Sequence, residues 1–264
     1  MKSLWLFGLG LLIGAWGSLC GIGGGVFAVP MFHFLCGMTL PAAIANSLVL
    51  VALMTSGGTL AELAQPGCAL HWDVVGVLLA TSWIGTQLGY RAAKKIAVRR
   101  LKLAFGVLLV GVALEILASS HERSALAGGD FEWSPGLIAL LAGTGFVSGF
   151  VSPLLGIGGG LIAVPALLFG LPAIGYLGAR ACSTAMSAFN AWLSVWLYRK
   201  RGGLRFELTL PASAGALCGS WAGVRLAHVP GITFYAEIVI ALTLLLISAR
   251  FVWDLRAKSY AGTP

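Results

Sequence analysis

A glycine-rich element occurs twice in this chain of 264 residues, and it is the part of the sequence best suited to bind a ligand. It reads GIGGGVFAVP at 21–30 and GIGGGLIAVP at 156–165, with eight of ten positions identical. Four glycines and a nearby proline disfavour a continuous helix. A helix that begins there directs free N–H groups and its positive dipole end at whatever lies in front of it. The pattern predicts an anion site at Gly23, Gly24, Gly25, Gly158, Gly159 and Gly160.

Close helix packing is the alternative role for such glycines. We predict that role for other glycines, which recur every four residues within apolar segments: Gly10 and Gly14, Gly145 and Gly149, and Gly215, Gly219 and Gly223. For the two GIGGG elements we favour the binding site and keep packing as the alternative. If they bind an anion through the backbone, valine at Gly24 or Gly159 should stop binding while the protein stays folded.

Polar residues open an apolar segment downstream of each GIGGG element. These are Asn46 and Ser47 in the first half and Cys182, Ser183 and Thr184 in the second. Their side chains could donate hydrogen bonds to an anion or bond neighbouring helices, and both roles remain open. Arg180 comes directly before the second group. It could pair with an anion through two parallel hydrogen bonds, or its long side chain could extend to the membrane interface.

Other residues that could carry chemistry are few. Carboxylates at membrane depth are functional candidates, so Glu62, Glu115 and Glu237 are possible proton carriers, although each could lie at a helix end. His33 is expected to be a hydrogen-bonded helix residue. The chain has four histidines, nine acidic residues and five cysteines, without an H-E-x-x-H, G-x-S-x-G or C-x-x-C pattern. These motifs mark metal, nucleophilic or redox sites, so we predict neither an enzyme nor a metal or cofactor.

The elements that must position these residues are membrane helices. The chain is 58% hydrophobic and 10% charged, against about 25% charged in soluble domains. Its apolar segments approach the ~20 residues that cross a bilayer as a helix, and only helices or closed barrels satisfy their backbone there. The segments fall at 4–19, 24–38, 41–63, 73–90 and 101–118, and then at 136–155, 159–173, 176–198, 207–226 and 233–253.

We therefore predict an all-α, polytopic membrane protein made of two repeats with four to five helical segments each. The repeats are 1–118 and 135–264, joined by a polar loop at 119–134. The second segment of each repeat is short and interrupted at its GIGGG element. Short, glycine-broken segments at matching places in two repeats point to the binding site of a transporter.

Charge predicts how the repeats are oriented. The net charge of +8 comes from basic clusters in short loops at 91–102 and 199–205, which is typical of cytoplasmic loops rather than of nucleic-acid binding. These loops occupy different places in the two repeats. If both are cytoplasmic, each repeat crosses the membrane an odd number of times and the repeats are inverted. Parallel repeats would instead place the loops on opposite sides.

The sequence resembles the TauE/SafE sulfite-exporter family over essentially its whole length. The resemblance lies in the duplicated GIGGG element, supported by GTQLGYR at 85–91 and GSWAGVR at 219–225. It implies a permease of the bacterial inner membrane that exports sulfite, sulfoacetate or a related organosulfur or carboxylate anion. We expect a secondary transporter working by alternating access, with a small anion and the lipid bilayer as its partners. An anion channel and a membrane assembly protein without transport are the alternatives.

Overall fold

The computed structural model describes residues 2–97, 131–199 and 204–229, together with residues 103, 106, 107, 110, 111, 114, 245, 248 and 249. This part of the chain is helical and contains no strand. The predicted segments at 101–118 and 233–253 lie mostly outside it, as do Glu115 and Glu237 and the distal residues of both basic loops. The prediction of an all-α, polytopic membrane protein is confirmed.

The described helices follow the predicted segments to within a few residues. In the first repeat they are α1 (Lys2–Cys20), α2 (Gly25–Pro30) with a π-helical continuation at Met31–Leu35, α3 (Leu40–Leu63) and α4 (Trp72–Ala93). In the second they are α6 (Pro135–Leu155), α7 (Gly160–Gly170), a 3-10 turn at Pro172–Ile174, α8 (Gly175–Tyr198) and α9 (Phe206–Ala227). Each GIGGG element therefore separates a long helix from a short one, as its glycine content predicts.

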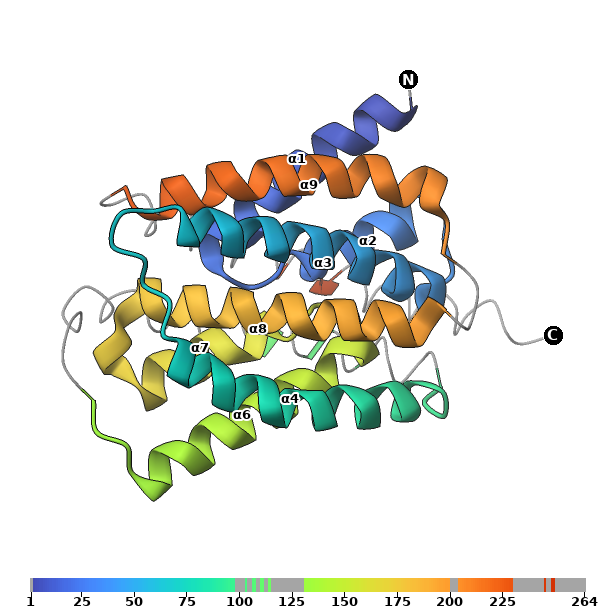
Figure 1. Ribbon diagram of the computed structural model, residues 1–264. Helices are drawn as coiled ribbons and strands as arrows, with labels where there is room; N and C mark the ends of the chain where they lie inside the picture. The colour runs from blue at the N-terminus through green and yellow to red at the C-terminus, as the bar shows by residue number, and fades with distance from the viewer. Residues whose placement is uncertain are drawn as a thin grey trace.

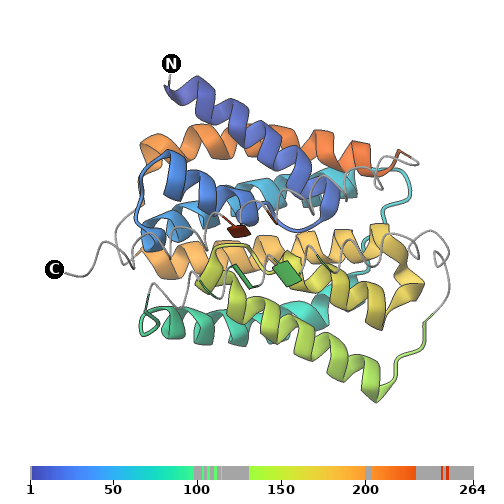
Figure 2. The same cartoon turned by 180° about the vertical axis from the view of Figure 1, so that it is seen from behind.

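The two repeats enter the bundle from opposite ends (Figures 1 and 2). α1 runs inward and stops, and α2 turns back toward the end at which α1 began. α6 and α7 do the same from the other end. The helices that follow, α3 and α8, run the length of the bundle in opposite directions. Each repeat thus brings its GIGGG element into the interior of the bundle.

Glycines bring the long helices together across the boundary between the repeats. On α1, Gly10 lies against the backbone of Ala212 of α9, so that an added Cβ would overlap the carbonyl of Ala212. On α4, Gly85 lies in the same way against the backbone of Phe146 of α6. The remaining predicted packing glycines also face backbone of these partner helices: Gly14, Gly145, Gly149, Gly215, Gly219 and Gly223. Their predicted packing role is confirmed, and it interlocks the repeats.

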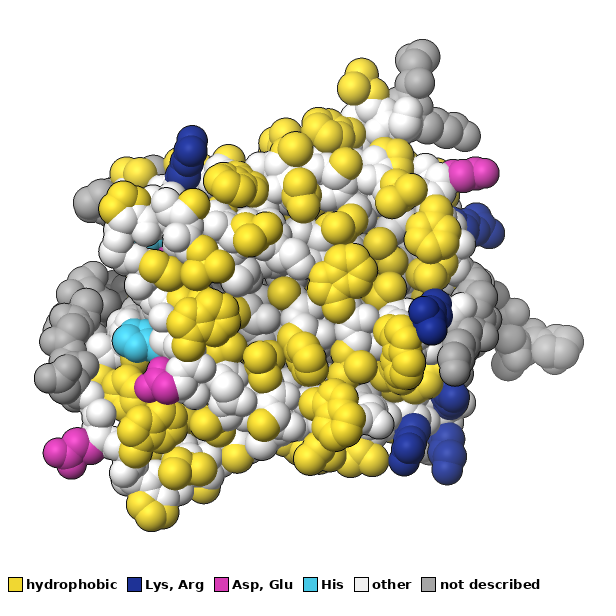
Figure 3. Space-filling model, in the orientation of Figure 1, with side chains coloured by type: hydrophobic (Ala, Val, Ile, Leu, Met, Phe, Trp, Pro, Cys, Tyr) yellow, Lys and Arg dark blue, Asp and Glu magenta, His cyan; other side chains and the backbone are white. Residues whose placement is uncertain are grey.

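The outer surface of the bundle is apolar along its length, and charged side chains gather at its two ends (Figure 3). Large side chains such as Trp83, Trp192 and Leu210 are about half exposed there. In the described part, three helices are long and apolar enough to cross a bilayer: α1, α3 and α6. The pair formed by α7 and α8, bent by 100°, is a fourth candidate. An apolar belt between charged ends is what a bilayer requires of a spanning protein.

Candidate functional site

The two GIGGG elements touch each other in the interior. Gly25 lies against the carbonyl of Gly156 and the Cα of Ile157. In the mirror contact, a Cβ on Gly160 would lie 2.7 Å from the carbonyl oxygen of Gly21. The two predicted glycine elements, one from each repeat, are therefore in direct contact. We call them the paired glycine turns (residues 21–25 and 156–160).

The backbone of the two turns has the same conformation. Gly24 and Gly159 each precede the first residue of a short helix, and no side chain caps either helix start. Glycine is required there because other residues rarely adopt a positive φ. Equivalent glycines of the two turns all have a positive φ. The values are 70° at Gly21 and 75° at Gly156, 81° at Gly23 and 77° at Gly158, and 61° at Gly24 and 97° at Gly159.

This geometry contradicts the expectation that valine at Gly24 or Gly159 leaves the fold intact. Besides the positive φ, a Cβ on Gly159 would lie 2.7 Å from the carbonyl oxygen of Ser148. A Cβ on Gly24 would lie 2.6 Å from the Sδ of Met54. A β-branched residue at either position would strain the backbone and displace neighbours, so binding and folding must be separated by other substitutions.

Each glycine turn is contacted by one buried serine from the other repeat. The hydroxyl of Ser47 on α3 lies 3.0 Å from the carbonyl oxygen of Gly156 and 2.8 Å from that of Ile44 on its own helix. The hydroxyl of Ser183 on α8 lies 3.1 Å from the carbonyl oxygen of Gly21 and 3.3 Å from that of Gly160. Both serines are fully buried. In this conformation they hold the two turns against each other, the interhelical role that sequence reasoning left open.

Two other predicted residues do not reach the turns. The Thr184 hydroxyl donates to the carbonyl oxygen of Arg180 on its own helix over 2.8 Å. The side-chain oxygen of Asn46 accepts hydrogen bonds from the backbone N–H of Arg205 over 2.8 Å and from the hydroxyl of Thr209 over 2.6 Å. Asn46 thereby fixes the start of α9 to α3.

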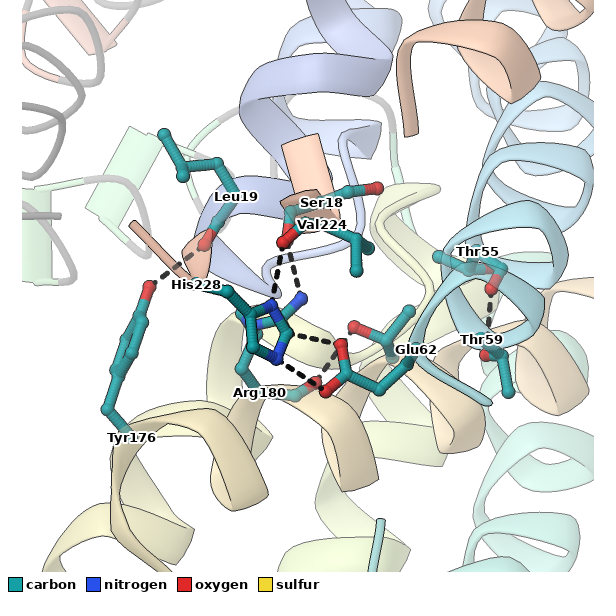
Figure 4. A network of polar contacts seen from close by, with 10 residues as sticks. Ser18, Leu19, Thr55, Thr59, Glu62, Tyr176, Arg180, Val224 and His228 are labelled. Carbon is teal, nitrogen blue, oxygen red and sulfur yellow. Dashed lines mark hydrogen bonds and ion pairs between the residues drawn. The ribbon is translucent and has the colours of Figure 1, made fainter. Parts of the chain in front are cut away.

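Arg180 lies beside the first turn, but its charge is directed elsewhere (Figure 4). Its aliphatic stem packs on Gly21. Its guanidinium forms an ion pair with Glu62 of α3 and donates to the carbonyl oxygen of Ser18 over 3.2 Å. Arg180 and Glu62 are only 1% and 2% exposed, so the arginine does not extend to the membrane interface. The ion pair makes this part of the interior nearly neutral.

His228, at the end of α9, completes the network around Glu62 (Figure 4). Its Nε2 lies 3.5 Å from the Oε1 of Glu62, and its Nδ1 lies 2.9 Å from the carbonyl oxygen of Val224. Sequence reasoning missed this network because α3, α8 and α9 contribute one residue each from distant parts of the chain. One signal could have indicated the ion pair: in the described part of the chain, one arginine and one glutamate lie at membrane depth, and buried opposite charges tend to pair. His33, the histidine considered beforehand, instead contacts the carbonyl oxygen of Met38 at 2.7 Å.

The second turn also has polar neighbours, and sequence reasoning missed two of them, Ser148 and Ser187. The side-chain amide of Asn190 on α8 donates to the carbonyl oxygen of Gly158 over 3.3 Å. Thr86 on α4 donates to the other end of the same amide over 3.4 Å. Ser148 on α6 and Ser187 on α8 also border this turn. In the described part of the chain, the hydroxyls of both serines are buried and have no hydrogen-bond partner.

Known proteins with similar sequences are membrane transporters by name. A probable membrane transporter protein of Xylella fastidiosa is 28% identical over 230 residues, which cover 83% of each chain. The probable membrane transporter YunE of Bacillus subtilis is 27% identical over 187 residues, covering 64% of this chain and 68% of YunE. The probable membrane transporter MamO of Magnetospirillum gryphiswaldense is 30% identical over 117 residues, but that match spans only 18% of MamO.

No solved structure matches this chain. The family model described as sulfite exporter TauE/SafE matches residues 1–116 and 141–263, which is most of the sequence. The matched residues include both glycine turns, all of α1, α4 and α9, and most of α6. The family consists of membrane transporters and not of enzymes. The chain therefore belongs to the TauE/SafE family of membrane transporters.

Proposed function

We propose that this protein is a secondary transporter that exports a small anion, such as sulfite, sulfoacetate or another organosulfur or carboxylate anion. The observation that carries the proposal is the meeting of two matched glycine turns in the interior of the bundle. Both short helices begin at these turns without a side-chain cap. Helix starts of this kind attract anions through free N–H groups and the helix dipole.

The transport cycle we propose is alternating access between two inverted repeats. The opposite directions of α3 and α8 support inversion (Figure 1). The reciprocal bonds of Ser47 and Ser183 connect the repeats at equivalent places. Rocking one repeat against the other would loosen one bond while keeping the other, and the reverse motion would exchange them. In the proposed cycle, a state in which both serines contact their turns is the occluded one, and both contacts are present here.

We place the protein in the bacterial inner membrane with the loops at 91–102 and 199–205 in the cytoplasm. The ends of α4 and α8 and the start of α9 lie at one end of the bundle, which supports a common side for both loops (Figure 1). The inside-negative potential favours anion exit by about 2.3 kcal/mol per charge per 100 mV. Labelling of single cysteines introduced at 95 and 204 tests the orientation. Labelling of the two sites from opposite sides of the membrane would refute it.

Flux measurements on the purified full-length protein in proteoliposomes test the function. We expect uptake of at least one anion from a panel of sulfite, sulfoacetate, methanesulfonate, acetate and phosphate, relative to liposomes without protein. A carrier saturates with concentration and shows accelerated exchange when the same anion is present on both sides. Flux that rises linearly without exchange would indicate a channel. No flux of any panel anion would refute the proposal and favour an assembly role.

A further inference from the structure

The ring of His228 faces a hydrogen-bond acceptor on each side (Figure 4). Its Nδ1 lies 2.9 Å from the carbonyl oxygen of Val224, and its Nε2 lies 3.5 Å from the Oε1 of Glu62. A neutral imidazole carries one N–H, so it can donate to only one of these two oxygens. The other contact then sets a nitrogen lone pair against an oxygen lone pair. A second ring proton satisfies both contacts at once.

Glu62 has one carboxylate oxygen available for that proton. Its Oε2 pairs with the guanidinium of Arg180, whereas its Oε1 is buried and has no hydrogen-bond partner in the described part of the chain. The Nε2 of His228 is likewise buried without such a partner there. Buried polar atoms are nearly always hydrogen-bonded, so two such atoms that face each other indicate a proton site.

Water reaches the ring of His228, whereas Glu62 is shielded from it. His228 is 23% exposed and Glu62 is 2% exposed. Both lie where α3 and α9 end, at the end of the bundle opposite to the ends of α4 and α8 (Figure 1). In the orientation proposed above, this is the outer side of the membrane. A proton from the outer aqueous phase therefore enters the network at the histidine.

The helices around Glu62 bring few other charged or titratable groups to it. From α8, Arg180 holds the Oε2 of Glu62, and Tyr176 donates to a backbone carbonyl of α1 over 3.1 Å. The end of α1 contributes a backbone carbonyl that accepts from Arg180. On α9, Arg225 is exposed. Among the described side chains, the two that form ion pairs with Glu62 are those of Arg180 and His228.

The equivalent positions at the other end of the bundle hold different residue types. By the interval that relates the two serines in contact with the glycine turns, Tyr198 corresponds to Glu62. By the interval that relates GSWAGVR to GTQLGYR, Lys94 corresponds to His228. Tyr198 packs edge-on against Tyr90, and the Nζ of Lys94 lies 4.5 Å from the centroid of the Tyr90 ring.

This comparison separates packing from proton binding. Histidine is the residue type whose ordinary charge change falls between about pH 5 and 8, and tyrosine and lysine are not. The fold thus closes one end of the bundle without a histidine or a carboxylate at these two positions. Packing alone therefore does not account for Glu62 and His228 at the other end.

We propose that Glu62 and His228 form a proton-binding site, and that the bound proton strengthens the binding of the transported anion. Arg180 pairs with Glu62 only while the carboxylate is ionised, so the proton resides on the Nε2 of His228. The charges of Glu62 and Arg180 cancel, so the network is neutral without the proton and carries one positive charge with it. A net charge acts more strongly in the low-dielectric interior than in water, and a positive one attracts an anion.

Proton and anion then promote each other's binding. The proton comes from water, forms an N–H bond at the Nε2 of His228 and returns to water when that bond breaks. Because linkage between two binding sites is reciprocal, anion binding also promotes proton uptake. The proton site itself goes beyond the proposed function, whereas its linkage to the anion rests on that function.

Nitrogen NMR on the histidines tests the proton site without any anion. Full-length protein in lipid bilayers, labelled with 15N at its histidines, gives different ring signals for nitrogens with and without a proton. The chain has four histidines, and His228→Ala identifies the signals of His228 by their loss. As the pH falls from about 8 to about 5.5, we expect the Nε2 to gain a proton while the Nδ1 keeps its own. An Nε2 whose protonation does not change over this range, or an Nδ1 that titrates instead, would overturn the site.

Binding of an anion of fixed charge tests the linkage. Methanesulfonate and acetate keep their charge between about pH 6 and pH 8, so a change in Kd reports on the protein. Isothermal titration of the full-length protein in detergent should give a Kd about tenfold lower at the lower pH, within the range of typical coupling. Titrations in two buffers of different ionisation enthalpy should show net proton uptake on binding.

His228→Ala should remove both the pH dependence and the proton uptake. The melting temperature of the variant shows whether it is folded. His33→Ala is the matched control, because His33 contacts the carbonyl oxygen of Met38 in the segment after α2 and forms no ion pair with Glu62. This control should keep both the pH dependence and the proton uptake.

The outcomes separate the proton site, its linkage and the proposed function. An equal Kd at both pH values in a protein that transports a panel anion overturns the linkage and leaves the proposed function standing. A pH dependence that persists in His228→Ala assigns the proton to another group and overturns the site. If the unmodified protein neither binds nor transports any panel anion, the proposed function and the linkage fail, and the NMR titration still decides whether the proton site exists.

Discussion

The ion pair of Arg180 with Glu62 makes a strong prediction for stability. Glu62→Gln keeps the shape of the side chain but removes its charge, leaving a guanidinium that is 1% exposed and has only the carbonyl of Ser18 as an acceptor among its described contacts. Removing one member of a buried ion pair costs about 3–5 kcal/mol, because the other charge stays buried without compensation. We therefore expect Glu62→Gln to lower the free energy of unfolding by about this amount.

Thermal unfolding in detergent measures the effect. One kcal/mol shifts the melting temperature of a chain of 150–250 residues by about 2–4 °C, so Glu62→Gln should lower it by roughly 10 °C. The double variant Glu62→Gln with Arg180→Met removes both charges at similar volume. Replacing both members of a buried pair by neutral groups is often close to neutral in stability, so the double variant should recover most of the loss.

His228→Ala provides the control within the same network. His228 lies 3.5 Å from Glu62 and is 23% exposed, so its loss should lower the melting temperature by only a few degrees, about 1 kcal/mol or less. If the double variant is no more stable than Glu62→Gln, the two charges do not depend on each other. The view of Arg180 as a residue neutralised by Glu62 would then be refuted, and Arg180 would return as a candidate for direct contact with the anion.

Further predictions concern the glycine contacts and the reciprocal serine bonds. Gly10→Ala should strongly reduce the yield of folded protein, because the new Cβ overlaps the backbone of Ala212. Gly8→Ala on the same helix should be tolerated, because its Cβ enters open space. Fluorescence-detected size-exclusion chromatography compares the yields of the two variants. Ser47→Ala and Ser183→Ala should each lower stability by about 0.5–1.5 kcal/mol, and thermal unfolding should give similar values because the bonds are equivalent. A clear effect of only one serine would argue against equivalent roles.

The sequence predicted most of the described fold because its signals are local. Apolar stretches, the GIGGG breaks and the polar loops determine where helices begin and end, and the boundaries of α3 and α8 lie within a few residues of the predicted segments. The four-residue spacing of glycines also predicted helix packing. It could not tell which helices pack, because small residues fit any close partner. That α1 packs on α9 and α4 on α6 emerges only from the three-dimensional structure.

The candidate site was predicted in part. The GIGGG repeats identified the two turns, and Ser47 and Ser183 lie against them. That any of these residues binds an anion stays a prediction. The ion pair of Arg180 with Glu62 was not predicted, because nothing in a single sequence pairs two residues that lie more than a hundred positions apart. Ser187 was overlooked because an isolated serine in an apolar segment has no distinguishing pattern.

The pairing of α1 with α9 also determines the order in which the protein can be assembled during synthesis. α1 ends at Cys20 and α9 begins at Phe206. At about 5–20 residues per second, the first helix leaves the ribosome on the order of 10–40 s before its partner. Its glycine face, which lies against backbone of α9 in the finished protein, must meanwhile face lipid, the insertion machinery or a temporary neighbour. α4 and α6 are much closer in sequence and can pair sooner, so the first helix to be made is among the last to reach its final contacts.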